Sequence, residues 1–388
     1  MSIWGKLAGR YEGTAEQPHR ILSLDGGGIR GILTLEILLQ VEMILGKALG
    51  RDGSFRLCQF FDYIGGTSTG AIIAAGLARG MSVTELLDFY EKTGPAMFDR
   101  QSLLKRWHAM YKSAPLQAEL QKKFGVDTTL EPEHLECLLL VVTRNSSTDS
   151  PWPVSSNPAA KYNDTRRPDC NLKIPLWQLV RASTAAPVFF PPEVVQWDPD
   201  DEEKAFIFVD GGMTPYNNPA FLLYRMATAP AYRLDWATGE DKLLIISLGT
   251  GYSESLDDNI GSPNRGLISN VTGIPGALMN GIMHDQDTNC RQVGRCVHGA
   301  VLDKEIGDMI PRDSSGKAIP LSQNLGREFL YARYNADLSR KGLDKLGLKD
   351  INPEKVQKLD SIEHIGDLRN IGRKVAEEVR LEHFGTFV

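Results

Sequence analysis

Short apolar runs alternate with segments of helical periodicity along the first two thirds of the chain. The runs are bounded by glycine, proline and polar turns, which is typical of buried strands. They lie at 21–24, 60–66, 135–145, 205–210 and 242–248. Four segments carry the helical pattern, at 32–49, 71–80, 83–92 and 175–186. Strands that alternate with helices, with glycine turns after the strands, predict a mostly parallel α/β sheet covered on both faces.

The pattern also predicts how the chain is divided. Residues 1–18 read as a loose lead-in and residues 19–251 as the α/β core. Residues 252–388 are more polar, and we expect a helical C-terminal extension that packs on the core or caps it. Residues 145–170 are rich in Pro, Ser, Asn and Asp, which predicts a long surface loop.

Composition narrows the classes of function. The net charge of −6 shows no excess of basic residues of the kind that binds nucleic acid. The five cysteines form no C-x-x-C pair, so we expect neither a disulfide framework nor a metal site. No secretory leader or membrane-spanning apolar run is expected either. The sequence therefore predicts a cytoplasmic protein that contacts a membrane, if at all, peripherally.

Residues 66–70 read Gly-Thr-Ser-Thr-Gly, a G-x-S-x-G pattern between a strand-like and a small-residue helical segment. In serine hydrolases the nucleophile sits on such a sharp strand-to-helix turn, and the flanking glycines let both elements approach closely. We therefore interpret Ser68 as a candidate nucleophile. An ordinary tight turn is the alternative.

A serine nucleophile needs a base, which is most often a histidine. His284 and His298 lie in a polar, helix-like stretch, and we interpret them as surface or packing residues. Asp210 ends an apolar run and is followed by two glycines, so in a parallel sheet it would share an edge with Ser68. Burial would raise its pKa and make it a better base. Asp210 is therefore the preferred base, with a simple Asx turn as the alternative.

Residues 25–31 read Asp-Gly-Gly-Gly-Ile-Arg-Gly, where a strand is expected to become a helix. Glycines before a helix leave N–H groups free at the positive end of its dipole, where they can hold a phosphate or an oxyanion. The segment also fits the dinucleotide fingerprint G-x-G-x-x-G, but no strand precedes Asp52, the acidic residue at the required distance. Both functions of the loop stay open at this point.

Three motifs in this order, residues 25–31, 66–70 and 210–212, resemble those of the patatin-like phospholipase family. Residues 181–192 (RASTAAPVFFPP) and 245–251 (IISLGTG) also resemble that family, so the resemblance covers residues 19–251. It implies a three-layer α/β/α fold and a Ser-Asp dyad without a histidine. It further implies hydrolysis of lipid acyl esters without a metal or another cofactor.

Carried over residue by residue, the resemblance implies a nucleophile, a general base and an oxyanion loop: Ser68, Asp210, and Gly26, Gly27 and Gly28. Within the loop, the N–H groups of Gly27 and Gly28 are the expected oxyanion donors. Arg30 matches the family's basic position and has two expected roles, binding a lipid phosphate of the substrate or bracing the loop.

Several alternatives remain at the level of the sequence. One is a neutral-lipid or other serine esterase that uses a histidine, and another is a nucleotide-binding module without activity. The chain also resembles bacterial phospholipase effectors switched on by cyclic nucleotides, so a small-molecule activator is a further expectation. Residues 103–113 mix basic and aromatic side chains, which suits a lid or an interfacial helix, although an ordinary amphipathic helix is preferred. Residues 252–388 have three candidate roles: covering the site, binding a regulator or forming a homo-oligomer.

Overall fold

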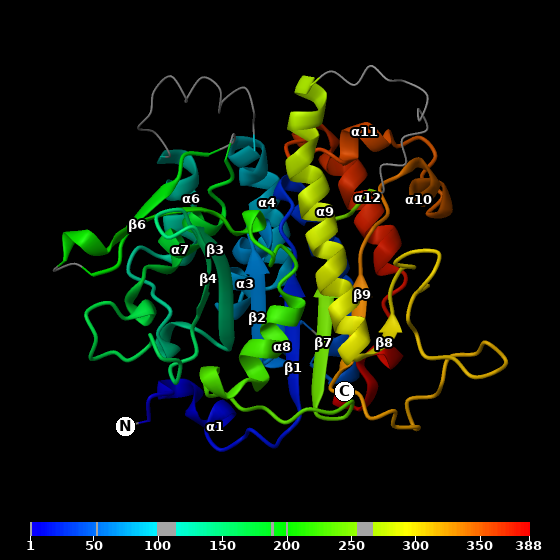
Figure 1. Cartoon of the computed structure of the whole chain (residues 1–388), viewed down its shortest axis with the longest axis horizontal. Coiled ribbons are helices and arrows are strands. Elements are labelled where there is room, and N and C mark those ends of the chain that lie inside the picture. Colours follow the sequence, from blue (N-terminus) through cyan, green and yellow to red (C-terminus); the bar gives the residue numbers. More distant parts are fainter. Residues whose placement is uncertain (1, 52, 99–113, 188–189, 199–200, 254–266) are drawn as a thin grey trace.

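A mixed, mostly parallel sheet forms the centre of the molecule (Figure 1). The computed structural model describes residues 2–388 except 52, 99–113, 188–189, 199–200 and 254–266. Within these residues the sheet has nine strands in the order β5-β6-β3-β2-β1-β7-β9-β8, with β4 paired to β3. The strands are β1 (His19–Leu24), β2 (Tyr63–Thr67), β3 (Leu138–Asn145), β4 (Ser150–Ser155), β5 (Glu193–Gln196), β6 (Ala205–Asp210), β7 (Leu243–Leu248), β8 (Arg295–His298) and β9 (Leu330–Tyr334).

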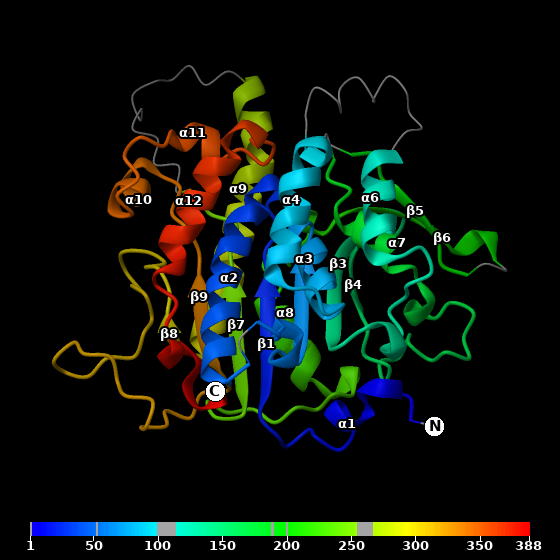
Figure 2. The same ribbon diagram turned by 180° about the vertical axis from the view of Figure 1, so that it is seen from behind.

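Helices cover both faces of the sheet and complete three layers (Figures 1 and 2). One face carries α2 (Gly31–Ala48), α3 (Thr69–Ala78), α4 (Val83–Phe98), α6 (Ala114–Phe124), α7 (Leu176–Ser183) and α12 (Ile365–Ala376). The other face carries α8 (Ala220–Thr228) and α9 (Leu267–Val293). The short helices are α1 (Ala8–Tyr11), α10 (Arg340–Lys345) and α11 (Pro353–Val356). The predicted three-layer α/β/α class is confirmed.

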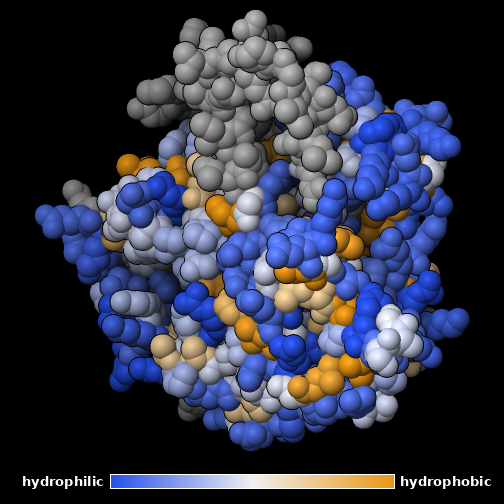
Figure 3. Space-filling model, turned by 45° about the vertical axis from the view of Figure 1, so that its right-hand side comes forward, coloured by the Kyte–Doolittle hydropathy of each residue, from blue (hydrophilic) through white to orange (hydrophobic). Residues whose placement is uncertain are grey.

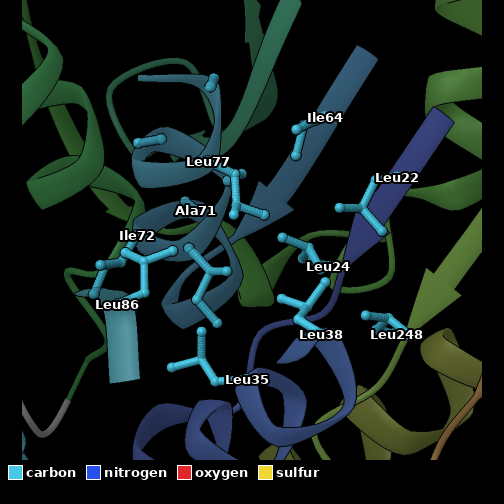
Figure 4. Packing of buried hydrophobic residues seen from close by; sticks show 14 of the residues in the cluster. Leu22, Leu24, Leu35, Leu38, Ile64, Ala71, Ile72, Leu77, Leu86 and Leu248 are labelled. Carbon is cyan, nitrogen blue, oxygen red and sulfur yellow. The ribbon is translucent and has the colours of Figure 1, made fainter. Parts of the chain in front are cut away.

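Alternating side chains of the central strands build two hydrophobic cores, one on each side of the sheet. Leu22 and Leu24 of β1 join the core under α2 and α3, whereas Ile21 joins the core under α8. Because both faces are covered, the strands read as continuous apolar runs rather than as alternating patterns. Figure 4 shows the first core, where strand residues meet helix residues, among them Leu22, Leu24, Ile64, Leu35, Leu38, Ala71 and Ile72.

The N-terminal lead-in is ordered, contrary to the loose segment predicted. Its α1 and the turn before it bury Trp4 and Tyr11 against the second core. The guanidinium of Arg10 donates to the carboxylate of Asp62 at 2.9 and 3.0 Å and to the carbonyl oxygen of Phe61 at 2.8 Å. These contacts join residues far apart in the sequence, so a local pattern could not indicate them.

The C-terminal segment is more than the helical extension expected after residue 251. Its β9 pairs in parallel with β7, and β8 pairs with β9, so the segment extends the central sheet by two strands. Its α12 packs on α2, where Arg369 and Arg373 form ion pairs with the buried Glu36. Residues 252–388 therefore share the sheet and the first core with the preceding part of the chain.

The predicted loop at 145–170 contains a strand that the sequence pattern did not indicate. β4 runs antiparallel to β3, from Asn145 opposite Ser150 to Leu140 opposite Ser155. The interfacial segment predicted at 103–113 lies outside the described residues. Among the described helices, none has the length and apolarity needed to cross a bilayer. The face of the molecule shown in Figure 3 is largely hydrophilic, with scattered apolar side chains.

Candidate active site

Ser68 stands on a strained turn between β2 and α3. Its backbone has φ 54° and ψ −122°, a left-handed conformation that is rare for a residue with a side chain. A Cβ at Gly66 would collide with the carbonyl oxygen of Gly70, and a Cβ at Gly70 would collide with that of Leu24. The two glycines of the G-x-S-x-G pattern thus let the turn close. The structure accordingly has the sharp strand-to-helix turn that the pattern predicts.

Asp210 reaches Ser68 from the opposite chain direction to the one expected. β6 is antiparallel to β3, with Asp210 opposite Thr143, whereas β2 is parallel to β3, with Thr67 opposite Val142. The expectation of a parallel strand was therefore wrong, although the proximity that it predicted holds. One edge of β3 pairs with β4 along residues 140–145, so β2, paired with 138–142, and β6, paired with 143–145, must both lie along the other edge. There β2 ends opposite Val142 and β6 ends opposite Thr143, which brings Ser68 and Asp210 together.

The hydroxyl of Ser68 donates a hydrogen bond of 2.6 Å from Oγ to Oδ2 of Asp210. The other carboxylate oxygen, Oδ1, accepts the N–H of Gly212 at 2.7 Å, which fixes the carboxylate plane. Asp210 is only 5% exposed, and this burial raises its pKa from 3.8 to about 6. The bonds from Ser68 and Gly212 and the charge of Arg181 oppose the rise in the pKa. The carboxyl is therefore a stronger base than one in water.

Ser183 anchors the strained turn at Ser68 through two hydrogen bonds. Its Oγ accepts the backbone N–H of Ser68 at 2.9 Å and donates to the carbonyl oxygen of Val142 at 2.7 Å. Ser183 is fully buried at the end of α7. Sequence reasoning missed this residue, although it lies in the family-like stretch at 181–192. The bond also occupies the Ser68 N–H, so this group is not free to bind substrate.

The glycine loop lies beside Ser68, since a Cβ at Gly26 would be 3.2 Å from the Ser68 Cβ. The N–H of Gly26 donates to the carbonyl oxygen of Asn217 at 3.1 Å and is therefore occupied. Within the described part of the chain, the N–H groups of Gly27 and Gly28 have no acceptor. Gly28 has φ +60° and stands against the carbonyl oxygen of Leu359, so two constraints require glycine there.

Arg30 points into the protein rather than toward solvent. It is 8% exposed, and its guanidinium donates to the carbonyl oxygens of Gly27 at 3.4 Å and Gln357 at 3.3 Å. Burial lowers its pKa to about 10. Of the two expected roles, the observed bonds favour bracing the loop over binding a lipid phosphate.

The residue before the loop, Asp25, is anchored by a buried ion pair that the sequence did not indicate. Its carboxylate accepts both terminal guanidinium nitrogens of Arg333 in β9, at 2.6 and 3.2 Å. Asp25 is fully buried and Arg333 is 4% exposed. The C-terminal segment therefore holds the glycine loop through Arg333 as well as through the Gln357 and Leu359 carbonyls.

The candidate histidines take no part in this arrangement. His284 is exposed on α9, and His298 in β8 lies near Glu378 and stacks on His383. The interpretation of both as surface or packing residues agrees with this placement. Over the described residues, His, Cys, Asp and Glu side chains form no cluster of three or more able to hold a metal ion.

The structure brings together a serine on a strained strand-to-helix turn, a buried carboxylate bonded to it and a glycine loop beside it. This arrangement is typical of serine hydrolases. Comparison with known proteins makes this more specific. The model of the family described as patatin-like phospholipase matches residues 22–224, just over half of the chain. The chain belongs to the patatin-like phospholipase family.

Two relatives illustrate the similarity. A cGAMP-activated phospholipase of Vibrio cholerae is 34% identical over 52% of this chain and 56% of its own. Patatin-17 of Solanum cardiophyllum is 31% identical over 61% of both chains. The chain thus spans less than two thirds of the length of these relatives.

Proposed function

We propose that this chain is a lipid acyl hydrolase of the phospholipase A type, with Ser68 as nucleophile and Asp210 as general base. The observation that carries the proposal is the 2.6 Å bond from the Ser68 hydroxyl to the buried Asp210 carboxylate. A base needs hydrogen-bond reach and a pKa near the working pH, and this pair has both. Membership of the family supports an acyl ester as the substrate.

The reaction has two halves. Asp210 takes the proton of the Ser68 hydroxyl while Oγ forms a bond to the acyl carbon, and the carbonyl electron pair moves onto oxygen. The tetrahedral intermediate collapses, the bond from the acyl carbon to the leaving oxygen breaks, and Asp210 returns the proton to the lysolipid alcohol. Asp210 then activates a water molecule, which releases the fatty acid and restores Ser68.

The N–H groups of Gly27 and Gly28 are the proposed oxyanion donors. They have no acceptor within the described chain, unlike that of Gly26, so the proposal narrows the predicted loop to two donors. In acyl transfer, loss of one such donor typically lowers the rate by about 10²–10³-fold. Arg30 is proposed to keep the loop in shape through its bond to the Gly27 carbonyl oxygen.

Regulation by a small molecule is a second proposal, which rests on a relative alone. The similar protein of V. cholerae carries the name cGAMP-activated phospholipase. A phospholipase that stays silent until a cyclic nucleotide binds is therefore the alternative to a constitutively active one. The proposed substrate in both cases is a phospholipid reached from the aqueous side of a membrane.

The test measures fatty-acid release from mixed phospholipid vesicles in EDTA, together with labelling by a serine-reactive fluorophosphonate. We expect release and labelling in the wild type, no release in either Ser68→Ala or Asp210→Asn, and unchanged release in the exposed controls Ser54→Ala and Asp241→Asn. A labelled but silent wild type would indicate a missing activator, and adding the cyclic nucleotide then tests the alternative. A wild type that neither reacts with the fluorophosphonate nor releases fatty acid would contradict the proposed enzymatic function.

A further inference from the structure

The Gly-Thr-Gly turn after β7, residues 249–251, lies beside the glycine loop. β1 and β7 are parallel neighbours, and their last residues, Leu24 and Leu248, are directly opposite each other. The N–H of Asp25 also donates to the carbonyl oxygen of Leu248 at 3.0 Å. The loop and the turn therefore leave the sheet side by side, at the carboxyl ends of their strands.

Thr250, in the middle of this turn, bonds to the glycine loop. Its hydroxyl donates to the carbonyl oxygen of Gly26 at 2.8 Å, and its side chain is fully buried. The side-chain nitrogen of Asn217 is a second and longer donor to the same oxygen, at 3.4 Å. A Cβ at Gly27 would lie 2.1 Å from the Thr250 Oγ1. Thr250 thus contacts the peptide that joins Gly26 to Gly27.

This peptide carries one of the two proposed oxyanion donors. The carbonyl oxygen of Gly26 and the N–H of Gly27 belong to the same planar unit, and in a trans peptide they point in opposite directions. Within the described residues no peptide bond is cis. A bond that fixes the direction of the carbonyl therefore also fixes the direction of the N–H. Because glycines on both sides leave this plane unusually free to rotate, its orientation depends on such a bond.

The turn that carries Thr250 is itself anchored. The carbonyl oxygen of Gly249 accepts the hydroxyl of Thr34 in α2 at 2.8 Å. The N–H of Gly249 donates to the carbonyl oxygen of Tyr334 in β9, also at 2.8 Å. A helix and a strand thus hold the residue before Thr250, so Thr250 can act as a fixed support for the loop.

We propose that Thr250 is a positioning residue for the oxyanion site. Its hydroxyl holds the peptide between Gly26 and Gly27 in the orientation that turns the Gly27 N–H toward the developing oxyanion. The inference rests on the proposed function, because only acyl transfer at Ser68 develops that charge. Oxyanion donors stabilise the transition state more than the bound ester. Loss of the hydroxyl should therefore slow the reaction without weakening substrate binding.

The experiment compares Thr250→Val, which removes the hydroxyl and nearly keeps the shape, with Thr250→Ser, which keeps the hydroxyl. The matched control is Thr14→Val, since Thr14 is also buried and its hydroxyl donates to a backbone carbonyl oxygen, that of Arg10, at 3.1 Å. We measure kcat and KM on a soluble short-chain ester. End-point labelling with the fluorophosphonate counts the active sites, which separates a slower reaction from a loss of folded protein.

Inhibition by an alkyl trifluoromethyl ketone reports on the oxyanion site directly. Ser68 Oγ adds to the carbonyl carbon of the ketone, the hydroxyl proton passes to Asp210, and the carbonyl electron pair becomes an oxyanion. The bound inhibitor therefore carries the charge that the Gly27 N–H is proposed to stabilise. A residue that only supports the fold would not change the inhibition constant per active site.

We expect Thr250→Val to lower kcat about tenfold with KM unchanged, the most that one neutral hydrogen bond usually contributes. The inhibition constant of the ketone should rise by a similar factor. The loss is smaller than that of a deleted donor, because the Gly27 N–H remains and Asn217 still bonds to the carbonyl. Thr250→Ser and Thr14→Val should stay close to the wild type in both measurements.

An unchanged kcat and inhibition constant in Thr250→Val would overturn the inference. A Thr250→Ser variant as slow as Thr250→Val would also overturn it, because the methyl group rather than the hydroxyl would then matter, and so would a rise in KM alone. If the wild type is labelled but hydrolyses no ester, the rates of labelling make the same comparison, since labelling also develops charge on a phosphoryl oxygen. A wild type without Ser68-dependent hydrolysis or labelling would contradict the proposed function itself, a failure seen before any Thr250 variant is compared.

Discussion

Replacing Asp210 by asparagine is expected to stabilise the fold while it removes the activity. Burial raises the pKa of this carboxyl from 3.8 to about 6. At 1.36 kcal/mol per pH unit, keeping the buried group ionised at neutral pH costs the folded state about 3 kcal/mol. An amide of the same shape avoids that cost and still offers an oxygen to the N–H of Gly212.

The sign of the pH dependence follows from the raised pKa. The folded protein holds this proton more tightly than the unfolded chain, so the contribution of Asp210 to stability is full below its ordinary pKa near 4. That contribution is lost as the pH rises through about 6. The stability advantage of Asp210→Asn over the wild type is therefore expected to grow between pH 4 and pH 7 to about 3 kcal/mol.

Urea unfolding at a series of pH values measures the difference, as the change in midpoint at constant slope. The exposed Asp241→Asn variant serves as the control and should follow the wild type at every pH. An advantage of Asp210→Asn that stays constant from pH 4 to pH 8, or that shrinks as the pH rises, would refute the reasoning. It would mean that burial does not disfavour the carboxylate.

Two further predictions concern the neighbours of the dyad. The rate on a soluble ester should rise with pH through an acid limb near pH 6. Because the charge of Arg181 lowers the pKa of Asp210, Arg181→Met should move that limb to higher pH. An unmoved limb in the pH–rate profile would contradict this prediction. Ser183→Ala should lower kcat with little change in KM and destabilise the fold by about 1–3 kcal/mol, since the Ser68 N–H and the Val142 carbonyl oxygen lose their partner. Steady-state rates and melting curves decide this, with the adjacent Thr184→Ala as the control that should leave kcat unchanged.

The central strands and the helices between them were readable from the sequence because local pattern determines them. The apolar runs at 21–24, 205–210 and 242–248 are β1, β6 and β7, and the segment at 32–49 is α2. The helix predicted at 83–92 begins with a capping box, in which the Ser82 N–H donates to the Glu85 carboxylate at 2.8 Å and the Glu85 N–H donates to the Ser82 hydroxyl at 3.2 Å. The glycines at 66 and 70 predicted the strained turn at Ser68, because they let the strand and the helix approach closely.

What the sequence could not show depends on contacts between distant segments. Glu36, a charged residue in the helix predicted at 32–49, is buried because α12 covers it with Arg369 and Arg373. Arg333 appears in the sequence as one cation among many, and only the pairing of β9 with β7 places it on Asp25. Ser183 likewise becomes a support of the site only once α7 packs beside the turn at Ser68.

The distance between Ser68 and Asp210 depends on the register in which the antiparallel strand β6 pairs with β3. Thr67 and Asp210 pair with adjacent residues of β3, so the separation of the proposed nucleophile and base is set by where β2 and β6 end along β3. A slip of one residue between β6 and β3 would turn Asp210 to the other face of the sheet. β4 opposes such a slip, because its Trp152 pairs with Thr143 of β3 and packs against Phe206 and Phe208 of β6. The geometry of the proposed reaction therefore depends on a strand within a segment whose composition reads as a loop.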